Sequence, residues 1–180
     1  MNYYISDLHF GHKNVIEFSG RPFSNIEEMD NTLITNWNSV VGKDDNVYIV
    51  GDFCYENEKP AKWYLEQLKG KKHLLIGNHD TDIIENYIEF RKYFESINQM
   101  FVVKDENNYI VLCHYPICEW SGFNNGYYHF YGHIHNKKNI AYGIMRNFDT
   151  AFNVGAEILD YTPRTFDEVI LYNQKHVEKR

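Results

Sequence analysis

The chain has 180 residues, of which 43% are hydrophobic and 17% aromatic, and its formal net charge is −7 at neutral pH. This length and composition predict one globular domain over residues 1–180 with a sizeable core, and they exclude a disordered chain. The acidic balance argues against broad binding to nucleic acid, which needs a basic patch. A phosphorylated substrate is still compatible with this charge, because bound divalent cations change the local field.

Neither the N-terminal residues, the apolar stretches nor the cysteines indicate a membrane or an oxidising compartment. No apolar stretch approaches the roughly 20 residues of a membrane span. The first five residues, Met1–Ile5, lack the basic and long apolar parts of a signal peptide. Cys54, Cys113 and Cys118 form no disulfide framework and no C-x-x-C pair. We therefore expect a cytoplasmic protein that does not contact membranes.

Strands and helices alternate over the first half of the chain. The predicted strands, each short and apolar, cover residues 2–5, 47–50 and 74–76. The predicted helices, each with apolar residues at helical spacing, cover residues 26–41, 60–68 and 82–94. The segment Ser24-Asn25-Ile26-Glu27 has the pattern of a capping box and marks the start of the first of these helices.

After Ser96 the period of the apolar residues changes to two, which is typical of strands. A hairpin is predicted from residues 100–103 and 109–113, which flank the polar segment 105–108. Further strands are predicted at residues 127–131, 151–154 and 158–161. Thr165 with Glu168 forms a second capping box, which opens a closing helix. The simplest arrangement is an α/β domain of two sheets packed face to face, with helices outside.

Residue types that bind metals recur in five short clusters, each at the end of a strand-like apolar run. They are Asp7 and His9 in S-D-L-H, Asp52 in V-G-D-F, Asn78 in G-N-H-D, His114 in C-H-Y-P, and His133 and His135 in G-H-I-H. Imidazole combined with carboxylate and amide oxygen suits Mn²⁺, Fe, Zn²⁺, Co²⁺ or Ni²⁺ better than Mg²⁺ or Ca²⁺. One carboxylate can bridge two ions about 3.5–4 Å apart, so the set predicts a two-metal hydrolytic site.

The order of these clusters, D-x-H, G-D, G-N-H-D, H and G-H-x-H, resembles the calcineurin-like metallophosphoesterase superfamily from Ser6 to His135. The segments F-G-H-K-N and G-R-P-F, and Y-P-I with Trp120, resemble a compact bacterial and phage branch of it. The resemblance implies a four-layer α/β/β/α sandwich of two mixed β-sheets flanked by helices. It also implies hydrolysis of phosphoesters by attack of a metal-bound hydroxide.

The resemblance also implies a role for each site residue. One metal would be held by Asp7, His9, Asp52 and His135, and the other by Asp52 as the bridge together with Asn78, His114 and His133. His79, beside Asn78, would protonate the leaving-group oxygen, and manganese is the cofactor we expect first.

Many relatives carry G-D-x-x-D, whose second Asp orients the catalytic His, but this chain has Tyr55 at that position. Another group must then orient His79, and the sequence offers Asp80 and Glu56.

Three further polar residues are candidates for binding the substrate phosphate: His12, Asn14 and Arg21. The guanidinium of Arg21 matches an oxyanion, although a salt bridge at a helix edge is an equal alternative. His12 lies three residues beyond His9 and could instead support a ligand from behind. Cys54 and Cys113 flank ligand positions but fit buried, inert thiols better than ligands.

The expected activity is hydrolysis of phosphodiester or phosphomonoester bonds in small molecules or nucleotides, because no large insertion closes the site. A protein phosphatase of the same superfamily is the first alternative, but the Arg of its G-N-H-E-x-R signature is absent from Asp80-Thr81-Asp82. A non-catalytic interaction module of this fold is the second alternative. The retained ligand set and His79 argue against it.

Overall fold

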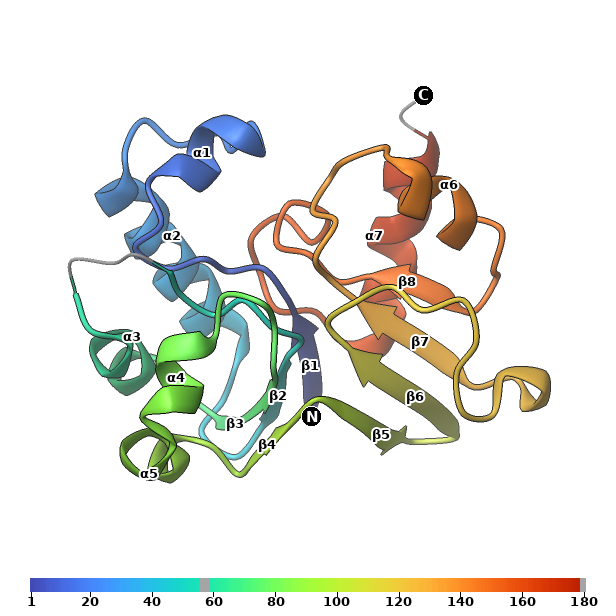
Figure 1. Cartoon of the computed structure of the whole chain (residues 1–180), viewed down its shortest axis with the longest axis horizontal. Coiled ribbons are helices and arrows are strands. Elements are labelled where there is room, and N and C mark those ends of the chain that lie inside the picture. Colours follow the sequence, from blue (N-terminus) through green and yellow to red (C-terminus); the bar gives the residue numbers. More distant parts are fainter. Residues whose placement is uncertain (56–58, 179–180) are drawn as a thin grey trace.

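Two four-stranded sheets form the centre of the computed structural model, which describes residues 1–55 and 59–178 (Figure 1). The first sheet has the order β1 (Asn2–Ile5), β2 (Asn46–Ile49), β3 (Lys71–Leu75) and β4 (Ser96–Asn98), with neighbouring strands parallel. The second has the order β5 (Met100–Asp105), β6 (Asn108–Cys113), β7 (Tyr128–Tyr131) and β8 (Ala151–Asn153). There β5 and β6 are antiparallel, whereas the other neighbours are parallel.

Helices cover the outer faces of both sheets, which confirms the four-layer sandwich (Figure 1). Beside the first sheet lie α1 (Asn14–Phe18), α2 (Ile26–Val40), α3 (Ala61–Gln67), α4 (Thr81–Glu85) and α5 (Tyr87–Phe90). Beside the second sheet lie α6 (Ile140–Met145) and α7 (Phe166–Glu178). Among the helices in the described part of the chain, none is long and apolar enough to cross a membrane.

Alternating side chains of each strand fill two different cores. Tyr4 of β1 faces the second sheet, where its ring meets Phe130 of β7 edge-on with the centroids 5.0 Å apart. Its neighbours Tyr3 and Ile5 face the other way and pack in one cluster with Leu33 of α2. Because successive strand residues point to opposite faces, one short strand stabilises both the interface between the sheets and the outer helix layer.

Strand register brings the ligand clusters to one edge of the sandwich. In the first sheet Ile5 pairs with Ile49, which pairs with Leu74, so the loops that follow β1, β2 and β3 leave the sheet together. In the second sheet Leu112 pairs with Phe130 of β7 in the same way. The carboxyl ends of parallel strands form the usual crevice for ligands in open α/β sheets.

Backbone contacts join the two sheets at this edge. Ser6 donates its N–H to the carbonyl of Val154 at 2.8 Å, and Ser6 forms a bridge with Gly155. Val154 in turn donates to the carbonyl of Tyr131. The loop after β1 is therefore held against the ends of β7 and β8, so groups from both sheets can share one site.

Two features of the first half differ from the sequence expectation. The helix predicted over 82–94 is instead α4, α5 and a 3-10 turn at Arg91–Tyr93, interrupted at Asn86. The Asn86 side chain bonds the Asp82 carbonyl, and such local bonds compete with helix continuation. The first capping box is also one residue later, because Asn25 accepts the N–H of Glu28.

The second half shows further differences. The strand predicted at residues 158–161 is wrong, because these residues form turns whose N–H groups bond locally, as Ile158 does to the Gly155 carbonyl. The hairpin is confirmed with longer strands and a two-residue turn at Glu106 and Asn107, where Glu106 has φ +52°. The short elements β4, α1 and α6 were not predicted from the sequence.

Candidate metal centre

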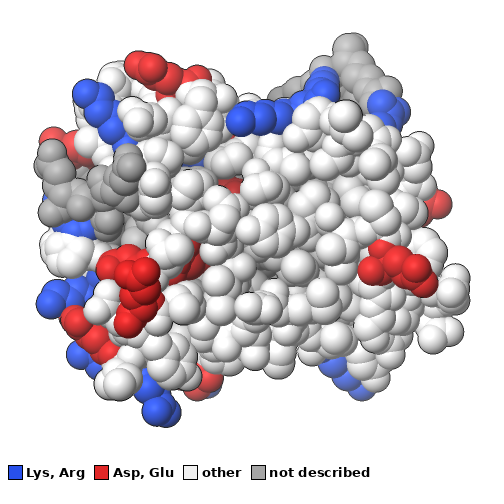
Figure 2. Space-filling view, in the orientation of Figure 1, with Lys and Arg blue, Asp and Glu red and all other residues white. Residues whose placement is uncertain are grey.

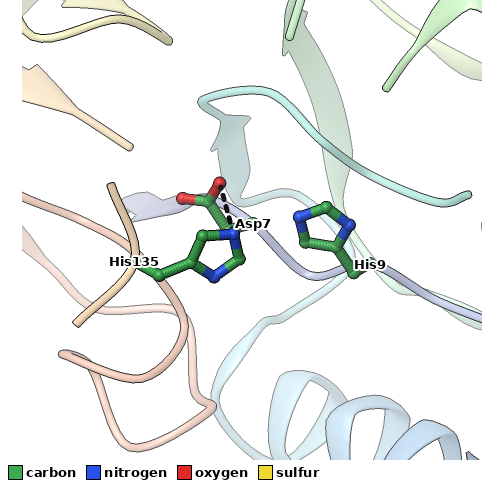
Figure 3. A group of neighbouring side chains, drawn as sticks. All are labelled: Asp7, His9 and His135. Carbon is green, nitrogen blue, oxygen red and sulfur yellow. Dashed lines mark ion pairs between the residues drawn. The ribbon is translucent and has the colours of Figure 1, made fainter. Parts of the chain in front are cut away.

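Five loops at the shared edge bring the seven predicted ligands into one cluster. Asp7, His9, Asp52, His114 and His135 are buried, whereas Asn78 and His133 are exposed on the open side. Two groups among them could hold an ion, with one ligand atom from each residue lying within 4.8 Å of the others: Asp7, His9 and His135, and Asp7, Asp52 and His114. Figure 3 shows Asp7 and His9, from the loop after β1, beside His135, from the loop after β7.

The Asp52 carboxylate lies between two imidazoles. Its Oδ2 atom is 3.5 Å from Nε2 of His9 and 3.4 Å from Nε2 of His114. Asn78 completes the open side, where its Oδ1 atom lies 2.9 Å from Nδ1 of His133 and 3.2 Å from Nε2 of His114. Nitrogen and oxygen donors therefore face one another across distances that a divalent cation could span.

Backbone conformation at the cluster is unusual. Asp7, His9, Asp52, His133 and His135 all have φ between +51° and +68°. A left-handed conformation costs a non-glycine residue roughly 1–2 kcal/mol, although Asp and His tolerate it better than most. Strain of this kind concentrates at functional sites.

Two glycines allow the loops to approach the ligands closely. A Cβ atom on Gly77 would collide with the Asp52 carboxylate and backbone. One on Gly132 would collide with Ser6 and with the Asp7 carboxylate. Any larger residue at these two positions would displace the carboxylates from the cluster.

His9 provides a direct test of whether the residues fit a metal. Its Nε2 atom is buried and has no hydrogen-bond partner among the described residues, while Nδ1 lies 3.3 Å from Nδ1 of His12. A buried polar atom without a partner is costly, and a bound cation would satisfy it. His12 thus lies behind His9 and supports it. This agrees with the support role that the sequence suggested for His12, not with a phosphate contact.

Electrostatics keep the central carboxylate ionised. Burial raises the pKa of Asp52, but the hydrogen bond and charge of His114 hold that pKa at about 2. The same pair acts on His114, where burial lowers the pKa while Asp52 and Asp7 raise it to about 9. The buried Asp52 is therefore an anion, and its group of residues could hold a cation.

His79 borders the cluster on its open side. Its backbone N–H donates to Oδ1 of Asp52 at 2.8 Å, and its ring lies 5.2 Å from the His9 ring. Asp80 does not face the His79 ring. Its carboxylate instead accepts backbone N–H groups, among them those of Asp52 and Gly77. Glu56, the other group considered for orienting His79, lies outside the described residues.

A cavity of about 290 Å³ opens over the cluster. Its lining comprises Phe18, Asp52, Asn78, His79, His133, Ile134, His135, Lys137 and Asn139. Neither Asn14 nor Arg21 is in this lining, whereas Phe18, Lys137 and Asn139, which were not predicted as site residues, are. Asn14 is exposed at the start of α1. Lys137 places its ammonium 5.2 Å from the centre of the Phe18 ring.

Arg21 and Glu157 form a buried ion pair beneath the cluster, with 2.8 Å between Nη2 and Oε1. The side-chain donors of Arg21 are directed at Glu157 and at two backbone carbonyls, which favours the salt-bridge alternative over a phosphate contact. Glu157 was not predicted as a site residue. It lies between the strands that were predicted at 151–154 and 158–161, two residues after Gly155.

Comparisons with known proteins agree with this geometry. The model of the calcineurin-like phosphoesterase family matches residues 3–159. An uncharacterized protein of Methanocaldococcus jannaschii, MJ1445, is 34% identical over 176 residues, which cover 96% of this chain and 91% of that protein. The gene 66 protein of Mycobacterium phage L5 is 42% identical over 81 residues, covering 43% of this chain and 39% of that protein.

A solved structure has the same fold along nearly the whole chain. It is a protein of unknown function, AQ665, from Aquifex aeolicus, with a TM-score of 0.72, 23% identity and coverage of 99% of this chain and 98% of that chain. This chain belongs to the calcineurin-like phosphoesterase family, a metal-dependent family of phosphoester hydrolases. The resemblance drawn from the order of the clusters is confirmed.

Proposed function

We propose that this protein hydrolyses phosphodiester or phosphomonoester bonds of small molecules or nucleotides with two divalent transition-metal ions. Asp7, His9, Asp52 and His135 hold one ion, and Asp52, Asn78, His114 and His133 hold the other. The observation that carries the proposal is the position of Asp52 Oδ2 at 3.5 Å from His9 and 3.4 Å from His114, one imidazole from each ligand set. The mixture of imidazole and oxygen donors favours manganese or another transition metal over Mg²⁺.

Bound divalent ions would polarise the phosphoryl oxygens and lower the pKa of a water molecule. The protein residues hold the substrate and move a proton. The attacking water would lose a proton to solvent and bond to phosphorus as the bond to the leaving oxygen breaks. His79 at the rim of the cavity would give a proton to that oxygen and regain one from solvent. Lys137 is placed to attract a phosphate oxygen at the cavity mouth.

The open cavity supports substrates that are small or extended. Most of the face drawn in Figure 2 is uncharged, and its Lys and Arg side chains lie in small groups near the edges. This distribution, with the net charge of −7, supports recognition of a phosphoester through the metal centre rather than through a broad basic surface.

The test is turnover of two aryl esters by metal-stripped protein to which single metals are added back. With Mn²⁺ we expect hydrolysis of bis-p-nitrophenyl phosphate, p-nitrophenyl phosphate or both, abolished by a chelator and poorly restored by Mg²⁺. A His135→Ala variant purified identically controls for contaminating phosphatases. Protein that binds two ions but turns over neither these esters nor a nucleotide panel would be a non-catalytic module. Full activity with Mg²⁺ alone would contradict the choice of metal.

A further inference from the structure

The side chain of Glu157 joins two ligand segments from below. Its Oε1 atom accepts from Nε of Arg21 at 2.9 Å and from Nη2 of Arg21 at 2.8 Å, and it lies 2.9 Å from Nδ1 of His135. The exposed fractions of these three side chains are 2%, 0% and 7% for Glu157, Arg21 and His135. Water therefore competes little with the two interactions.

Arg21 extends the connection to the first ligand loop. Its Nη2 donates to the backbone carbonyl of Asp7 at 2.6 Å, and its Nη1 donates to that of Leu8 at 2.9 Å. The loop that carries Asp7 and His9 is thus fixed to the same guanidinium that binds Glu157. Arg21 also supplies the opposite charge that a buried carboxylate requires.

The contact between Glu157 and His135 determines which ring nitrogen of His135 is available to bind a metal. With Nδ1 facing the carboxylate, Nε2 is left on the side of Asp7, 3.8 Å from its Oδ1 atom. A carboxylate that accepts Nδ1–H fixes the tautomer in which Nε2 carries a lone pair, and it makes that nitrogen a stronger donor to a metal. Ser19 also lies near Nδ1, with its Oγ atom at 3.2 Å, but a hydroxyl brings no negative charge.

A second observation concerns the other carboxylate oxygen. Oε2 of Glu157 is buried and has no hydrogen-bond partner among the described residues. A Cβ placed on Gly155 would lie 3.6 Å from this atom and 3.4 Å from Oδ2 of Asp7, so both carboxylates approach the same point. Two buried carboxylates that approach one glycine repel each other, and positive charge beside them offsets the repulsion. Arg21 supplies it on one side, and a cation held by Asp7 would supply it on the other.

We propose that Glu157 is a positioning residue for the metal ligand His135, and that Arg21 ties it to the loop of Asp7 and His9. The inference rests on the proposed metal site and goes beyond it, because neither residue is a ligand. It assigns Arg21 to the support of the metal centre and not to the substrate.

Metal binding, not activity, is the first readout. Metal-free protein is titrated with Mn²⁺ and with Co²⁺, and affinity and stoichiometry are measured for the wild type, Glu157→Gln and Glu157→Asp. Glu157→Asp keeps a charge beside Arg21 but shortens the side chain by one methylene. We expect about 10–100-fold weaker binding of one ion and near-normal binding of the other. Asp105→Asn, which changes a half-buried carboxylate that accepts from Asn2 at the start of β1 and from the hydroxyl of Tyr4, should leave both affinities unchanged.

Testing Glu157→Gln in a variant that lacks His135 distinguishes a positioning role of Glu157 from a general effect on stability. In a His135→Ala background, Glu157→Gln should cause no further loss of metal affinity, because the residue acts through the missing imidazole. A merely structural role would lower the thermal midpoint in both backgrounds and reduce metal affinity equally in both. That additive result would overturn the inference.

A measurement on the wild type covers the case in which the variants fail to fold. Long-range ¹H–¹⁵N NMR correlations of the imidazoles show which nitrogen of His135 carries the proton in the metal-free protein. We expect Nδ1 to carry it, and a proton on Nε2 alone would contradict the inference. If wild-type protein binds no divalent ion, the proposed function fails. If it binds two and the Glu157 variants match it, this inference fails by itself.

Discussion

The ring of Tyr55 packs edge-on against the imidazole of His79, with the ring centroids 4.2 Å apart and the planes at 62°. Tyr55 occupies the position at which many relatives carry the second Asp of G-D-x-x-D. The contact restrains the His79 ring by packing, without the negative charge that an Asp would bring. We therefore expect His79 to contribute most to the rate with substrates whose leaving group needs a proton.

Removing His79 should harm poor leaving groups more than good ones. A p-nitrophenolate departs with little help, whereas an alkyl or ribose alkoxide needs a proton in the transition state. General acids contribute about 10²–10⁴-fold. His79→Ala should lose about that much on an alkyl or nucleoside diester, less on an aryl ester, and keep its metals. Steady-state rates on both substrate types, with metal analysis of each preparation, provide the measurement.

Tyr55 offers a matched control for this experiment. Tyr55→Phe keeps the aromatic edge against His79 and should retain the wild-type ratio of rates on the two substrates. Tyr55→Ala removes the packing and should shift that ratio toward the His79→Ala value. Equal losses on both substrates in His79→Ala, with metals retained, would make His79 an electrostatic or positioning group instead of an acid.

Replacing the bridging carboxylate should weaken both metal sites at once. Asp52→Asn removes one negative ligand that the two ions share, so metal content should fall at both. Asp7→Asn is the matched comparison, because Asp7 is an equally buried carboxylate that our assignment gives to one ion. Metal analysis after dialysis should show retention of one ion in Asp7→Asn and of less than one in Asp52→Asn. The reverse pattern would make Asp7 the bridge.

Much of this site could be predicted from the chain alone, because each ligand follows a strand and carries a recognisable neighbour. Gly51 precedes Asp52, and Gly132 precedes His133. The strands can be recognised in the sequence because their apolar residues either alternate with a period of two or form a continuous run. Parallel register then brings their ends together without further information.

The support of the site could not be predicted in the same way. Glu157 is 136 positions from Arg21 in sequence, and their pairing depends on how the loops after β1 and β8 meet. Asp80 was considered as a partner of His79, but its carboxylate turns to the backbone N–H groups of the neighbouring loop. Short elements such as α1, with five residues, carry too few apolar positions to show a period.

The cysteines should be dispensable for metal binding. Cys54 and Cys113 are buried and Cys118 is exposed, and none belongs to either group of residues that could hold an ion. A triple Cys→Ser variant should keep its metal content and its activity. Its thermal midpoint should fall, because two buried thiols are replaced by hydroxyls that need partners. Loss of metal from a variant that remains folded, judged by circular dichroism, would contradict this expectation.

His129 should make the protein less stable as the pH falls. The ring is buried, with Nδ1 3.0 Å from the Val111 carbonyl and Nε2 accepting the N–H of Ile117 at 3.3 Å, so it is held neutral. Burial lowers the pKa of His129 from 6.5 to about 4 in the folded protein, although the backbone hydrogen bonds oppose this. The unfolded chain takes up a proton near pH 6.5 while the folded chain does not. Stability from this residue is therefore complete above pH 6.5 and is lost as the pH falls toward 4.

The loss should amount to about 3 kcal/mol, at roughly 1.4 kcal/mol for each pKa unit. Urea unfolding of metal-free wild type and His129→Gln at pH 7, 6, 5 and 4 measures it, because the carboxylates common to both proteins cancel in the difference. We expect the wild type to lose most of its stability advantage over His129→Gln between pH 7 and pH 4. His73→Gln, which changes a half-buried ring whose pKa is also lowered by burial, should show a smaller change. A difference between wild type and His129→Gln that is independent of pH would mean that the folded protein accepts the proton at His129 as readily as the unfolded chain does.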